Sequence, residues 1–424
     1  MAQGSDANHT YGILVGGGPA PGINGVIGAA ATTALRAGSR VLGIVDGCKW
    51  LIEGKSAVES GEHVRDLTLG EVEQIHLRGG SILHTSRANP TKNPDHLASC
   101  VATLDSLGVD RLITIGGDDT AFSAKSIADA AGGRIQVAHV PKTIDNDLPL
   151  PVGVPTFGFE TAREQGQSVI ERIHEDCRTT NRWFIVIMMG RHAGHLALGT
   201  AMSAGAPVGV IREEFTRTPI RLDEVVRVIE GAIVKGLAAG NPSGVAVVAE
   251  GVAELLDPND LEALKDVPLD EHGHIRLAEI PFGKVLSDAL KKSLGDRGVS
   301  VAFGTKDVGY ELRCATPSAF DREYTRHLGV GAVETLRAGK SGVLITRQAG
   351  RTVPVSFEEL MDPKTGRTRV RMVDVASDIF KSALALQSRV TAADLADADR
   401  LAAIAAAAGL SPTEARQRYA PLGG

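Results

Sequence analysis

Three charged side chains crowd a short segment between two prolines. In "PKTIDNDLP", residues 141–149, Lys142, Asp145 and Asp147 follow the apolar run "IQVAHV". A carboxylate can take a proton from a hydroxyl group as a general base, and a lysine can neutralise charge on a phosphoryl group in transfer. A solvated loop explains such a density of charge less well. The segment therefore indicates a catalytic site that transfers a group to a hydroxyl.

Two adjacent carboxylates follow the run "RLITI" in the stretch "GGDDT", where Asp118 and Asp119 come directly after two glycines. Glycines after a strand commonly form a phosphate-binding loop. Two adjacent carboxylates, however, should repel a phosphate. One of the carboxylates could instead hold Mg²⁺, because hard cations prefer oxygen ligands and bridge protein to phosphate oxygens. Taken alone, the pair fits a solvated loop equally well.

A glycine loop stands near the start of the chain, in "VGGGPAPGIN", residues 15–24. Glycine lets the backbone approach a ligand closely, and the N–H groups at a helix start attract anions. We expect Asn24 to cap the helix that follows. The loop lacks the GK[ST] ending of a P-loop, and Pro21 replaces the third glycine of GxGxxG. A tight packed turn therefore stays an alternative to a phosphate site.

A fourth stretch, "MMGRHAGHLAL", places Arg191 after Gly190, where a guanidinium could grip a phosphate or a sugar. His192 and His195 have the HxxH spacing of some metal sites, but no third ligand stands nearby in the sequence. We interpret these two histidines as structural or supporting residues.

The elements that position these stretches follow the rhythm of βαβ units. Apolar, β-branched runs alternate with alanine-rich helical patterns, which is typical of a mostly parallel sheet. In such sheets ligands bind beyond the carboxyl ends of the strands, where all four stretches stand. Proline, glycine and charge interrupt the pattern at 149–158, where we expect a change of domain or sheet direction, and at 264–277 and 361–370, where we expect exposed hairpins or loops. The alanine-rich segment 392–419 is helix-prone.

Composition narrows the class of protein. The chain has 424 residues, 43% of them hydrophobic, and 45 basic against 51 acidic residues give a net charge of −6. Such a balance provides no global positive field for nucleic acid. We also expect no membrane span, and the polar start "MAQGSDANHT" lacks a signal-peptide pattern, so we expect a cytoplasmic protein. We interpret four widely spaced cysteines as buried or inert thiols: Cys48, Cys100, Cys177 and Cys314.

Taken in order, these stretches resemble the phosphofructokinase family. The matching features are the glycine loop at 16–18, "GGSILHTSR" ending at Arg87, "GGDDT", "PKTIDND", "MGRHAG", the strand ending at Glu250, and "YELRCATPSAFDR" from Tyr310. The resemblance spans roughly residues 12 to 340, and "TIDND" followed by "MGR" is highly specific. It implies two Rossmann-like α/β domains with mostly parallel sheets and an active site in the cleft between them.

The resemblance also implies which substrate each domain binds. The phosphoryl-donor domain would comprise 1–155 with about 310–365, and the fructose 6-phosphate domain would comprise 156–309 with about 366–424, including a C-terminal helical extension. Arg182 matches an arginine that reaches into a neighbouring subunit's site, which implies a homodimer or homotetramer.

The family motif assigns roles residue by residue. Asp145 matches the catalytic base that takes the proton of the sugar's 1-hydroxyl, Asp147 a supporting carboxylate, and Asp118 the Mg²⁺ ligand. Asp119 and Lys142 join Asp145 and Asp147 in the implied catalytic set. The positions matching the donor side are Gly17, Gly18, Arg87, Asp119 and Lys142. The positions matching the fructose 6-phosphate side are Thr143, Ile144, Asp145, Arg182, Met189, Gly190, Arg191, Glu250, Tyr310 and Arg313.

Two positions discriminate the phosphoryl donor. Members that use ATP carry glycine where this chain has Asp119 and Lys142, and the pair is similar to the pattern of pyrophosphate-dependent members. A carboxylate occupies the volume of the α-phosphate of ATP, and two charges about 4 Å apart repel by about 4 kcal/mol at an effective dielectric near 20. Pyrophosphate is shorter and stops before this clash. We therefore expect reversible, Mg²⁺-dependent phosphorylation of fructose 6-phosphate by pyrophosphate.

Several departures from the family leave alternatives open. Pro19 stands where many ATP-using members have aspartate, and Tyr310 replaces a histidine. A second cross-subunit arginine has no obvious counterpart, so sedoheptulose 7-phosphate is a conceivable substrate. Ile27 and Ala31 replace effector-binding arginines, which predicts weak or no allosteric control. The rival hypotheses are an ATP-dependent enzyme and a non-catalytic sugar-phosphate sensor.

Overall fold

The computed structural model of the protein describes residues 7–59, 61–260, 281–365 and 367–421. The chain divides into two compact units, each built from two stretches of sequence. The first unit is Met1–Ala162 with Tyr310–Arg371, and the second is Arg163–Gly309 with Met372–Gly424. The sequence interpretation had placed the three boundaries after 155, after 309 and after about 365. The binding roles expected of the two units stay predictions.

The first unit contains one mixed sheet, which has seven strands among the described residues, in the order β11-β10-β5-β4-β1-β2-β3. The strands from β10 to β2 run parallel, whereas β3 and β11 pair antiparallel at the two edges. The strands are β1 (Thr10–Val15), β2 (Arg40–Ile44), β3 (Val64–Asp66), β4 (Arg111–Gly116), β5 (Gln136–Pro141), β10 (Val343–Gln348) and β11 (Arg351–Ser356).

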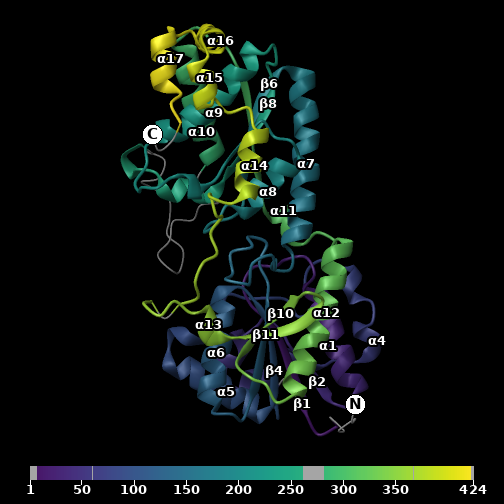
Figure 1. Cartoon of the computed structure of the whole chain (residues 1–424). Helices are drawn as coiled ribbons and strands as arrows, with labels where there is room; N and C mark the ends of the chain where they lie inside the picture. The colour runs from purple at the N-terminus through teal and green to yellow at the C-terminus, as the bar shows by residue number, and fades with distance from the viewer. Residues whose placement is uncertain (1–6, 60, 261–280, 366, 422–424) are drawn as a thin grey trace. The chain divides into compact units, whose positions relative to one another are not determined.

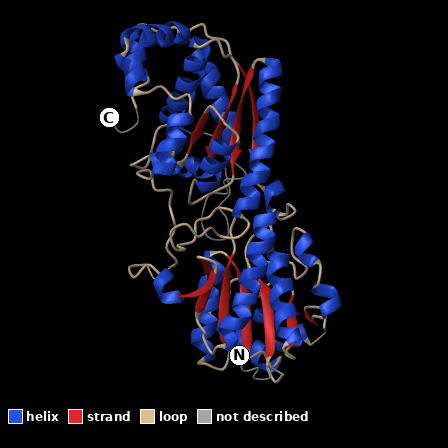
Figure 2. Cartoon of the chain, turned by 45° about the vertical axis from the view of Figure 1, so that its right-hand side comes forward, coloured by secondary structure: helices blue, strands red, loops and turns tan. Residues whose placement is uncertain are grey.

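Helices cover both faces of this sheet (Figures 1 and 2). In β1, Ile13 packs in a core cluster with helices α1 and α12, while the next residue, Leu14, packs in the cluster that includes α5 and α6. Burial of both faces explains why the strand runs are continuously apolar rather than alternating. The helices of this unit are α1 (Ile23–Arg36), α2 (Lys49–Glu53), α3 (Lys55–Val58), α4 (Leu69–Val72), α5 (Pro94–Ser106), α6 (Asp118–Ala131), α11 (Tyr310–Arg313), α12 (Ala319–Arg337) and α13 (Phe357–Leu360).

The second unit has a parallel sheet with the order β7-β8-β6-β9 in the described part of the chain. Its strands are β6 (Arg182–Met188), β7 (Val208–Val210), β8 (Gly244–Ala249) and β9 (Ala302–Val308). Helix α7 (Phe159–Thr180) starts in the first unit and ends in the second. The other helices are α8 (His195–Ser203), α9 (Leu222–Ala238), α10 (Phe282–Gly295), α14 (Asp378–Leu386), α15 (Ala392–Ala396), α16 (Ala398–Ala408) and α17 (Pro412–Arg418).

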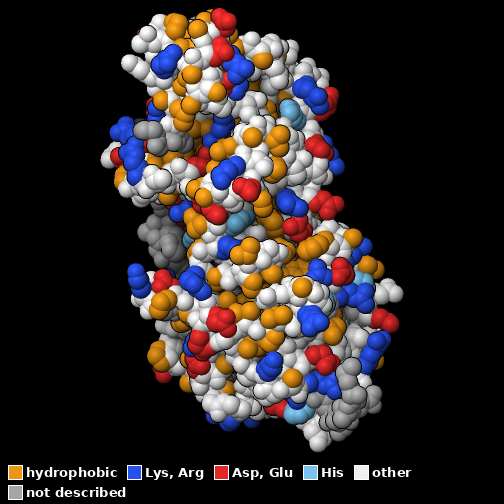
Figure 3. All heavy atoms as spheres, in the orientation of Figure 1, with side chains coloured by type: hydrophobic (Ala, Val, Ile, Leu, Met, Phe, Trp, Pro, Cys, Tyr) orange, Lys and Arg blue, Asp and Glu red, His pale blue; other side chains and the backbone are white. Residues whose placement is uncertain are grey.

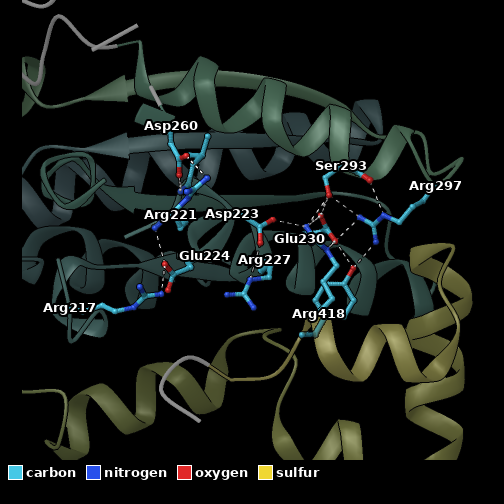
Figure 4. Close-up of polar contacts among 12 residues, drawn as sticks. Arg217, Arg221, Asp223, Glu224, Arg227, Glu230, Asp260, Ser293, Arg297 and Arg418 are labelled. Atoms are coloured by element: carbon cyan, nitrogen blue, oxygen red, sulfur yellow. Dashed lines mark hydrogen bonds and ion pairs between the residues drawn. The ribbon is translucent and has the colours of Figure 1, made fainter. Parts of the chain in front are cut away.

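A buried ionic cluster ties the C-terminal helix to α9 and α10 (Figure 4). The Glu230 side chain is 0% exposed and accepts hydrogen bonds from Arg418, Tyr419 and Ser293 at 2.6 to 2.9 Å. Arg297 lies 2.6 Å from the same carboxylate. Burial pushes the pKa of Glu230 upward, but these hydrogen bonds outweigh it and hold the pKa at about 2.

The predicted α/β pattern is confirmed in the strands and helices that flank the motifs. The C-terminal segment 392–419 is helical as expected, in α15, α16 and α17. The stretch 361–370 turns back on itself through an antiparallel bridge between Met361 and Thr368, as expected of a hairpin. The stretch 264–277 lies outside the described residues.

The expected role of Asn24 is wrong. Asn24 does not cap α1, because Gly22 occupies the N-cap position. The Asn24 side chain is buried; it donates to the carbonyls of Arg78 and Gly79 at 3.3 Å and accepts from Ile82 N at 2.9 Å. Its amide therefore pins the segment before Arg87 to α1, a long-range contact that outweighs the local capping preference.

The burial of the cysteines and the charges on the surface can be compared with the expectations drawn from composition. Cys48, Cys100 and Cys177 are buried, as one form of the expectation had it, whereas Cys314 is exposed. That Cys314 is inert stays a prediction. Basic and acidic side chains are interspersed on the face shown in Figure 3. Within the described residues, no helix is both long and apolar enough to cross a membrane.

Candidate active site

Three motifs of the first unit meet at one edge of its sheet. Strands β1, β4 and β5 are parallel neighbours, so their carboxyl ends lie side by side. Gly16 N donates to Ile115 O at 2.9 Å, and Lys142 N donates to Gly116 O at 2.8 Å. The glycine loop, "GGDDT" and "PKTIDND" therefore begin next to one another, as the sequence pattern predicted from strand ends.

Lys142 is the buried cation of this edge. The residue is only 4% exposed, and its Nζ donates to the carbonyl oxygen of Gly18. Burial and then the like charge of Arg313 lower the pKa of Lys142 to about 8, although nearby carboxylates, first that of Asp145, act in the opposite direction. A desolvated ammonium held against the glycine loop is positioned to meet a negatively charged group there.

The glycines of the loop are required by close contacts. Gly17 has a φ of 79°, and a Cβ at Gly16 would lie 2.5 Å from Oγ1 of the buried Thr120. A Cβ at Gly116 would lie even closer, 2.3 Å from the same oxygen. Side chains at these positions would collide with Thr120 of α6, so glycine lets the loop and the end of β4 lie close to this helix.

The stretch "GGSILHTSR" lies beside the glycine loop. Gly17 N donates to Ser86 O at 2.8 Å, and Thr85 Oγ1 donates to Gly17 O at 2.6 Å. Arg87 follows directly and its side chain is exposed. The structure thus brings together the loops that carry the predicted donor-side residues Gly17 and Arg87, which stand 70 positions apart in the sequence.

Asp118 and Asp119 are the first two residues of helix α6 and are exposed. The pair is solvated, but it lies in a helix, so the alternative of a loop is wrong. Gly117 occupies the N-cap without a side chain, so the first turn of the helix presents its backbone N–H groups and positive dipole end. Negative side chains are favourable at this end of a helix, which explains how two adjacent carboxylates are tolerated.

The loop that carries Asp145 is braced by its neighbours. Asp145 N donates to Thr143 Oγ1 at 3.0 Å, and Asn146 adopts a left-handed conformation with a φ of 56°. The buried Thr156 donates its hydroxyl to Thr143 O at 2.7 Å and its backbone N–H to Asn146 Oδ1 at 3.0 Å. Ile144 is buried within the loop. This bracing gives the Asp145 backbone a defined conformation.

A histidine that the sequence interpretation missed supports the same edge. His139 is fully buried in β5, and its ring nitrogens lie 2.8 Å from Thr114 Oγ1 and 3.1 Å from Gly116 O. Burial lowers its pKa to about 3. A neutral ring that donates to Gly116 O and accepts from Thr114 satisfies both contacts. The available signal was a histidine inside the otherwise apolar run "IQVAHV".

Arg313 lies closer to the donor loop than its predicted role implies. The resemblance assigned Arg313 and Tyr310 to the sugar phosphate, and both stand in the short helix α11 of the first unit. The Cζ of Arg313 would lie 3.4 Å from a Cβ at Gly18, and the guanidinium also lies over the ring of Tyr310, 5.2 Å from its centroid. Arg313 and Lys142 therefore bring two cations to the same glycine loop.

In the second unit, the loop after β6 is held by the residues after β8. Gly190 N donates to Glu250 Oε1 at 3.1 Å, and Gly251 N donates to Gly190 O at 3.3 Å. A Cβ at Gly251 would lie 2.1 Å from Arg191 O, so only glycine fits there. The predicted residues Gly190, Arg191 and Glu250 are thus brought together, with Met189 adjoining them.

Arg182 stands apart from that group. It is the first residue of β6, whereas Met189 follows the last residue of the same strand. A strand of this length separates its ends by roughly 20 Å, at about 3.3 Å per residue. Arg182 pairs with Asp176 of its own chain, with its Nε 3.0 Å from the Asp176 carboxylate. Within the chain, Arg182 therefore does not belong to the Gly190 group.

The family model for phosphofructokinase matches residues 10–336, which include all of these motifs. The chain belongs to the phosphofructokinase family. This membership confirms the resemblance drawn from "TIDND" and "MGR".

Curated relatives in this family match nearly the whole chain. The pyrophosphate--fructose 6-phosphate 1-phosphotransferase of Naegleria fowleri is 47% identical over 411 residues, which cover 95% of this chain and 93% of that protein. The protein of the same name from Thermotoga maritima is 47% identical over 413 residues, covering 96% of this chain and 97% of that protein.

The fold agrees with a solved phosphofructokinase. The structure of the pyrophosphate-dependent phosphofructokinase from Nitrosospira multiformis matches with a TM-score of 0.67 at 18% identity, covering 91% of this chain and 93% of that one. At this identity the likeness establishes the fold alone, and it confirms the predicted α/β class with mostly parallel sheets.

Proposed function

We propose that this phosphofructokinase-family chain transfers a phosphoryl group reversibly from pyrophosphate to the 1-hydroxyl of fructose 6-phosphate, with Mg²⁺. The oxygen of the sugar hydroxyl forms a bond to one phosphorus of pyrophosphate, the bridging P–O bond breaks, and orthophosphate leaves. The hydroxyl proton passes to a carboxylate. The reaction belongs to glycolysis or gluconeogenesis, and a cytoplasmic location stays a prediction.

The observation that carries this proposal is the buried Lys142 at the glycine loop. Its Nζ is held at Gly18 O, and its lowered pKa reflects a charge that lacks the stabilisation it would have in water. A phosphate in the loop supplies the missing counter-charge. The guanidinium of Arg313 lies next to the same glycine and adds to the attraction. Phosphoryl transfer depends mostly on such positioning and charge stabilisation.

The carboxylates of the next loop provide the proton acceptor. Asp145 takes the proton of the 1-hydroxyl as general base, and Asp147 supports it. Both side chains are near enough to Lys142 to raise its pKa, so base and cation act at the same edge of the sheet. On the sugar side, we assign binding of fructose 6-phosphate to Thr143, Ile144, Asp145, Arg182, Met189, Gly190, Arg191, Glu250, Tyr310 and Arg313.

The residues present fit a magnesium ion that is shared with the substrate. Asp118 is exposed in the first turn of α6 and is near enough to affect Lys142. Among the described residues, no group of three or more His, Cys, Asp or Glu side chains could hold a metal by itself. Mg²⁺ commonly takes one or two carboxylates together with phosphate oxygens, so Asp118 suffices on the protein side. When bound, Mg²⁺ neutralises charge on the phosphate oxygens.

The choice of donor rests on Asp119. Its carboxylate is exposed beside Asp118 at the positive end of α6, where it is stable without a substrate. Next to a bound donor it repels a third phosphate, and the repulsion is about 4 kcal/mol at about 4 Å. Pyrophosphate avoids this penalty and ATP does not. The buried Ile27 and Ala31 in α1 offer no charge for an effector, which supports a non-allosteric enzyme.

Assays with each donor test the proposal. Purified protein with fructose 6-phosphate and Mg²⁺ should turn over pyrophosphate and leave ATP nearly untouched. Asp119→Gly should raise activity with ATP relative to pyrophosphate, and Asp119→Gly with Lys142→Gly should lose pyrophosphate activity. Activity of the wild type with ATP and not with pyrophosphate would establish the rival ATP-dependent enzyme, and an unchanged donor ratio in Asp119→Gly would remove the repulsion argument.

A further inference from the structure

An arginine outside every predicted motif holds the loop of the proposed base. Arg371 is the last residue of the first unit and follows the hairpin at 361–370. Its backbone N–H donates to Asp147 O at 2.7 Å, and its Nε donates to Asn146 O at 2.9 Å. Both acceptors lie within two residues of Asp145. The chain therefore returns, more than 200 residues later, to grip the two carbonyls that follow the base.

The rest of the guanidinium completes a fork. Nη2 donates to Asn146 Oδ1, and Nη1 donates to Val154 O at 2.8 Å. Asn146 Oδ1 also accepts from Thr156 N at 3.0 Å, so one side chain receives donors from two segments. Because Asn146 has a positive φ, its conformation is one that ordinary residues resist unless neighbours hold it.

Partial burial disfavours the charged form of Arg371. Burial lowers its pKa from the usual value, and the carboxylate of Asp147 acts in the opposite direction, with Tyr324 contributing in the same sense as Asp147. Arg371 is partly buried, and its guanidinium donates to two backbone carbonyls and to one amide oxygen. A lysine cannot reproduce these directional contacts, since only the planar guanidinium has five fixed N–H groups.

We propose that Arg371 is a positioning residue for phosphoryl transfer, which sets the angle at which Asp145 meets the sugar hydroxyl by clamping Asn146 and Asp147. The inference rests on the proposed function for the role of Asp145. Arg371 itself touches no reacting atom. Misplacement of a catalytic group by about 1 Å can cost about 10²-fold in rate.

Three variants test the clamp. Arg371→Ala should lower kcat by about 10²-fold while KM for pyrophosphate changes little, because Lys142 and Gly18 keep their own contact. Arg371→Lys should recover little of the loss, since an ammonium cannot form the fork. Guanidinium ion at millimolar concentration should restore part of kcat in Arg371→Ala. Arg389→Ala is the control for loss of a partly buried arginine in the second unit, where Arg389 donates to Gly209 O and pairs with the carboxylate of Glu214. The kcat of the folded Arg389→Ala protein should not change or respond to guanidinium.

Hydrogen exchange provides a measurement that does not depend on activity. In Arg371→Ala, amides in a peptide covering 143–147 should exchange faster, whereas peptides of α6 should not change. Asn146→Gly removes the shared acceptor, so its effect on exchange and on kcat should be non-additive with that of Arg371→Ala.

The outcomes separate the two proposals. Unchanged exchange at 143–147 in Arg371→Ala, or an equal loss of kcat in Arg389→Ala, overturns the clamp. A wild type that transfers phosphate from neither donor overturns the proposed function, and the exchange experiment still decides whether Arg371 holds the loop.

Discussion

Two buried charges in this chain show opposite solutions to the same problem. Lys142 in the first unit is 4% exposed and Glu230 in the second unit is 0% exposed. Glu230 is surrounded by two guanidinium groups and two hydroxyls, and its pKa falls to about 2 (Figure 4). Lys142 has a carbonyl partner and a neighbouring arginine, and its pKa falls to about 8, which disfavours its charged form.

The difference separates a structural charge from a functional one. In the Glu230 cluster, hydrogen bonds and opposite charges offset the desolvation of the carboxylate. The cluster joins α9, α10 and α17. At Lys142 the groups within the protein do not fully offset the desolvation of the ammonium, since its pKa is lowered overall. A substrate phosphate can supply the missing stabilisation. We therefore expect substitutions at Lys142 to affect activity and substitutions at Glu230 to affect stability.

The largest expected effect is that of Lys142→Met. It removes the cation at the glycine loop, so kcat/KM with pyrophosphate should fall by on the order of 10³-fold, about 4 kcal/mol of transition-state stabilisation. The free energy of unfolding should stay equal or rise, because a poorly solvated charge is removed. Steady-state kinetics and urea unfolding measure the two quantities. A strongly destabilised variant would place Lys142 with the structural charges.

Glu230→Gln is the complementary test. The amide leaves Arg297 and Arg418 without their counter-charge, and the free energy of unfolding at pH 7 should fall by about 3 kcal/mol. Because the folded pKa of Glu230 is about 2 and its ordinary value is 4.5, its contribution is present above pH 4.5 and is lost as pH falls towards 2. The wild type and the variant should therefore converge in stability in acid. A loss of kcat in the folded variant would contradict the assignment of Glu230 as a purely structural charge.

The pH profile sharpens the role of Lys142. Its pKa of about 8 in the free protein means that the ammonium form, which attracts phosphate, is lost as pH rises through 8. The value of kcat/KM for pyrophosphate should fall about tenfold per pH unit above this point, about 1.4 kcal/mol. In Lys142→Arg the basic limb should disappear from this range, whatever activity remains, because arginine stays charged. A limb at the same pH in that variant would assign the titration to another group.

The smallest expected effect is that of Tyr419→Phe. The hydroxyl donates to Glu230 at 2.6 Å and accepts from Arg297 at 3.2 Å. Its removal should lower the free energy of unfolding by about 1 kcal/mol and leave kcat unchanged. Thermal and urea unfolding measure this effect. Indifference of stability to this change would indicate that the guanidinium groups alone hold the carboxylate.

Much of the candidate site could be predicted because its residues follow strands. The pattern placed Lys142 after β5, Asp118 after β4 and Glu250 after β8, and the structure has them there. Parallel neighbours must end at the same edge, so short-range pattern was enough to gather these loops. The role of each residue came from the family motif and stays a prediction.

Other parts could not be predicted, since they depend on partners far away in the sequence. Local preference suggested a cap at Asn24, but its amide binds backbone 54 to 58 positions later. The sequence left a solvated loop open for the carboxylates of "GGDDT", whereas they begin α6. Nothing local indicated that Arg371 returns to the loop of Asp145.

The sequence by itself determined the α/β class, the family, and the charged residues that follow the strands, because apolar periodicity and motif spacing are local properties. Only the tertiary structure decided that Lys142 is buried against Gly18, that Arg313 lies beside it, and that Glu230 is fully compensated. Burial and pKa depend on which groups surround a charge, and those groups come from segments that only packing brings together.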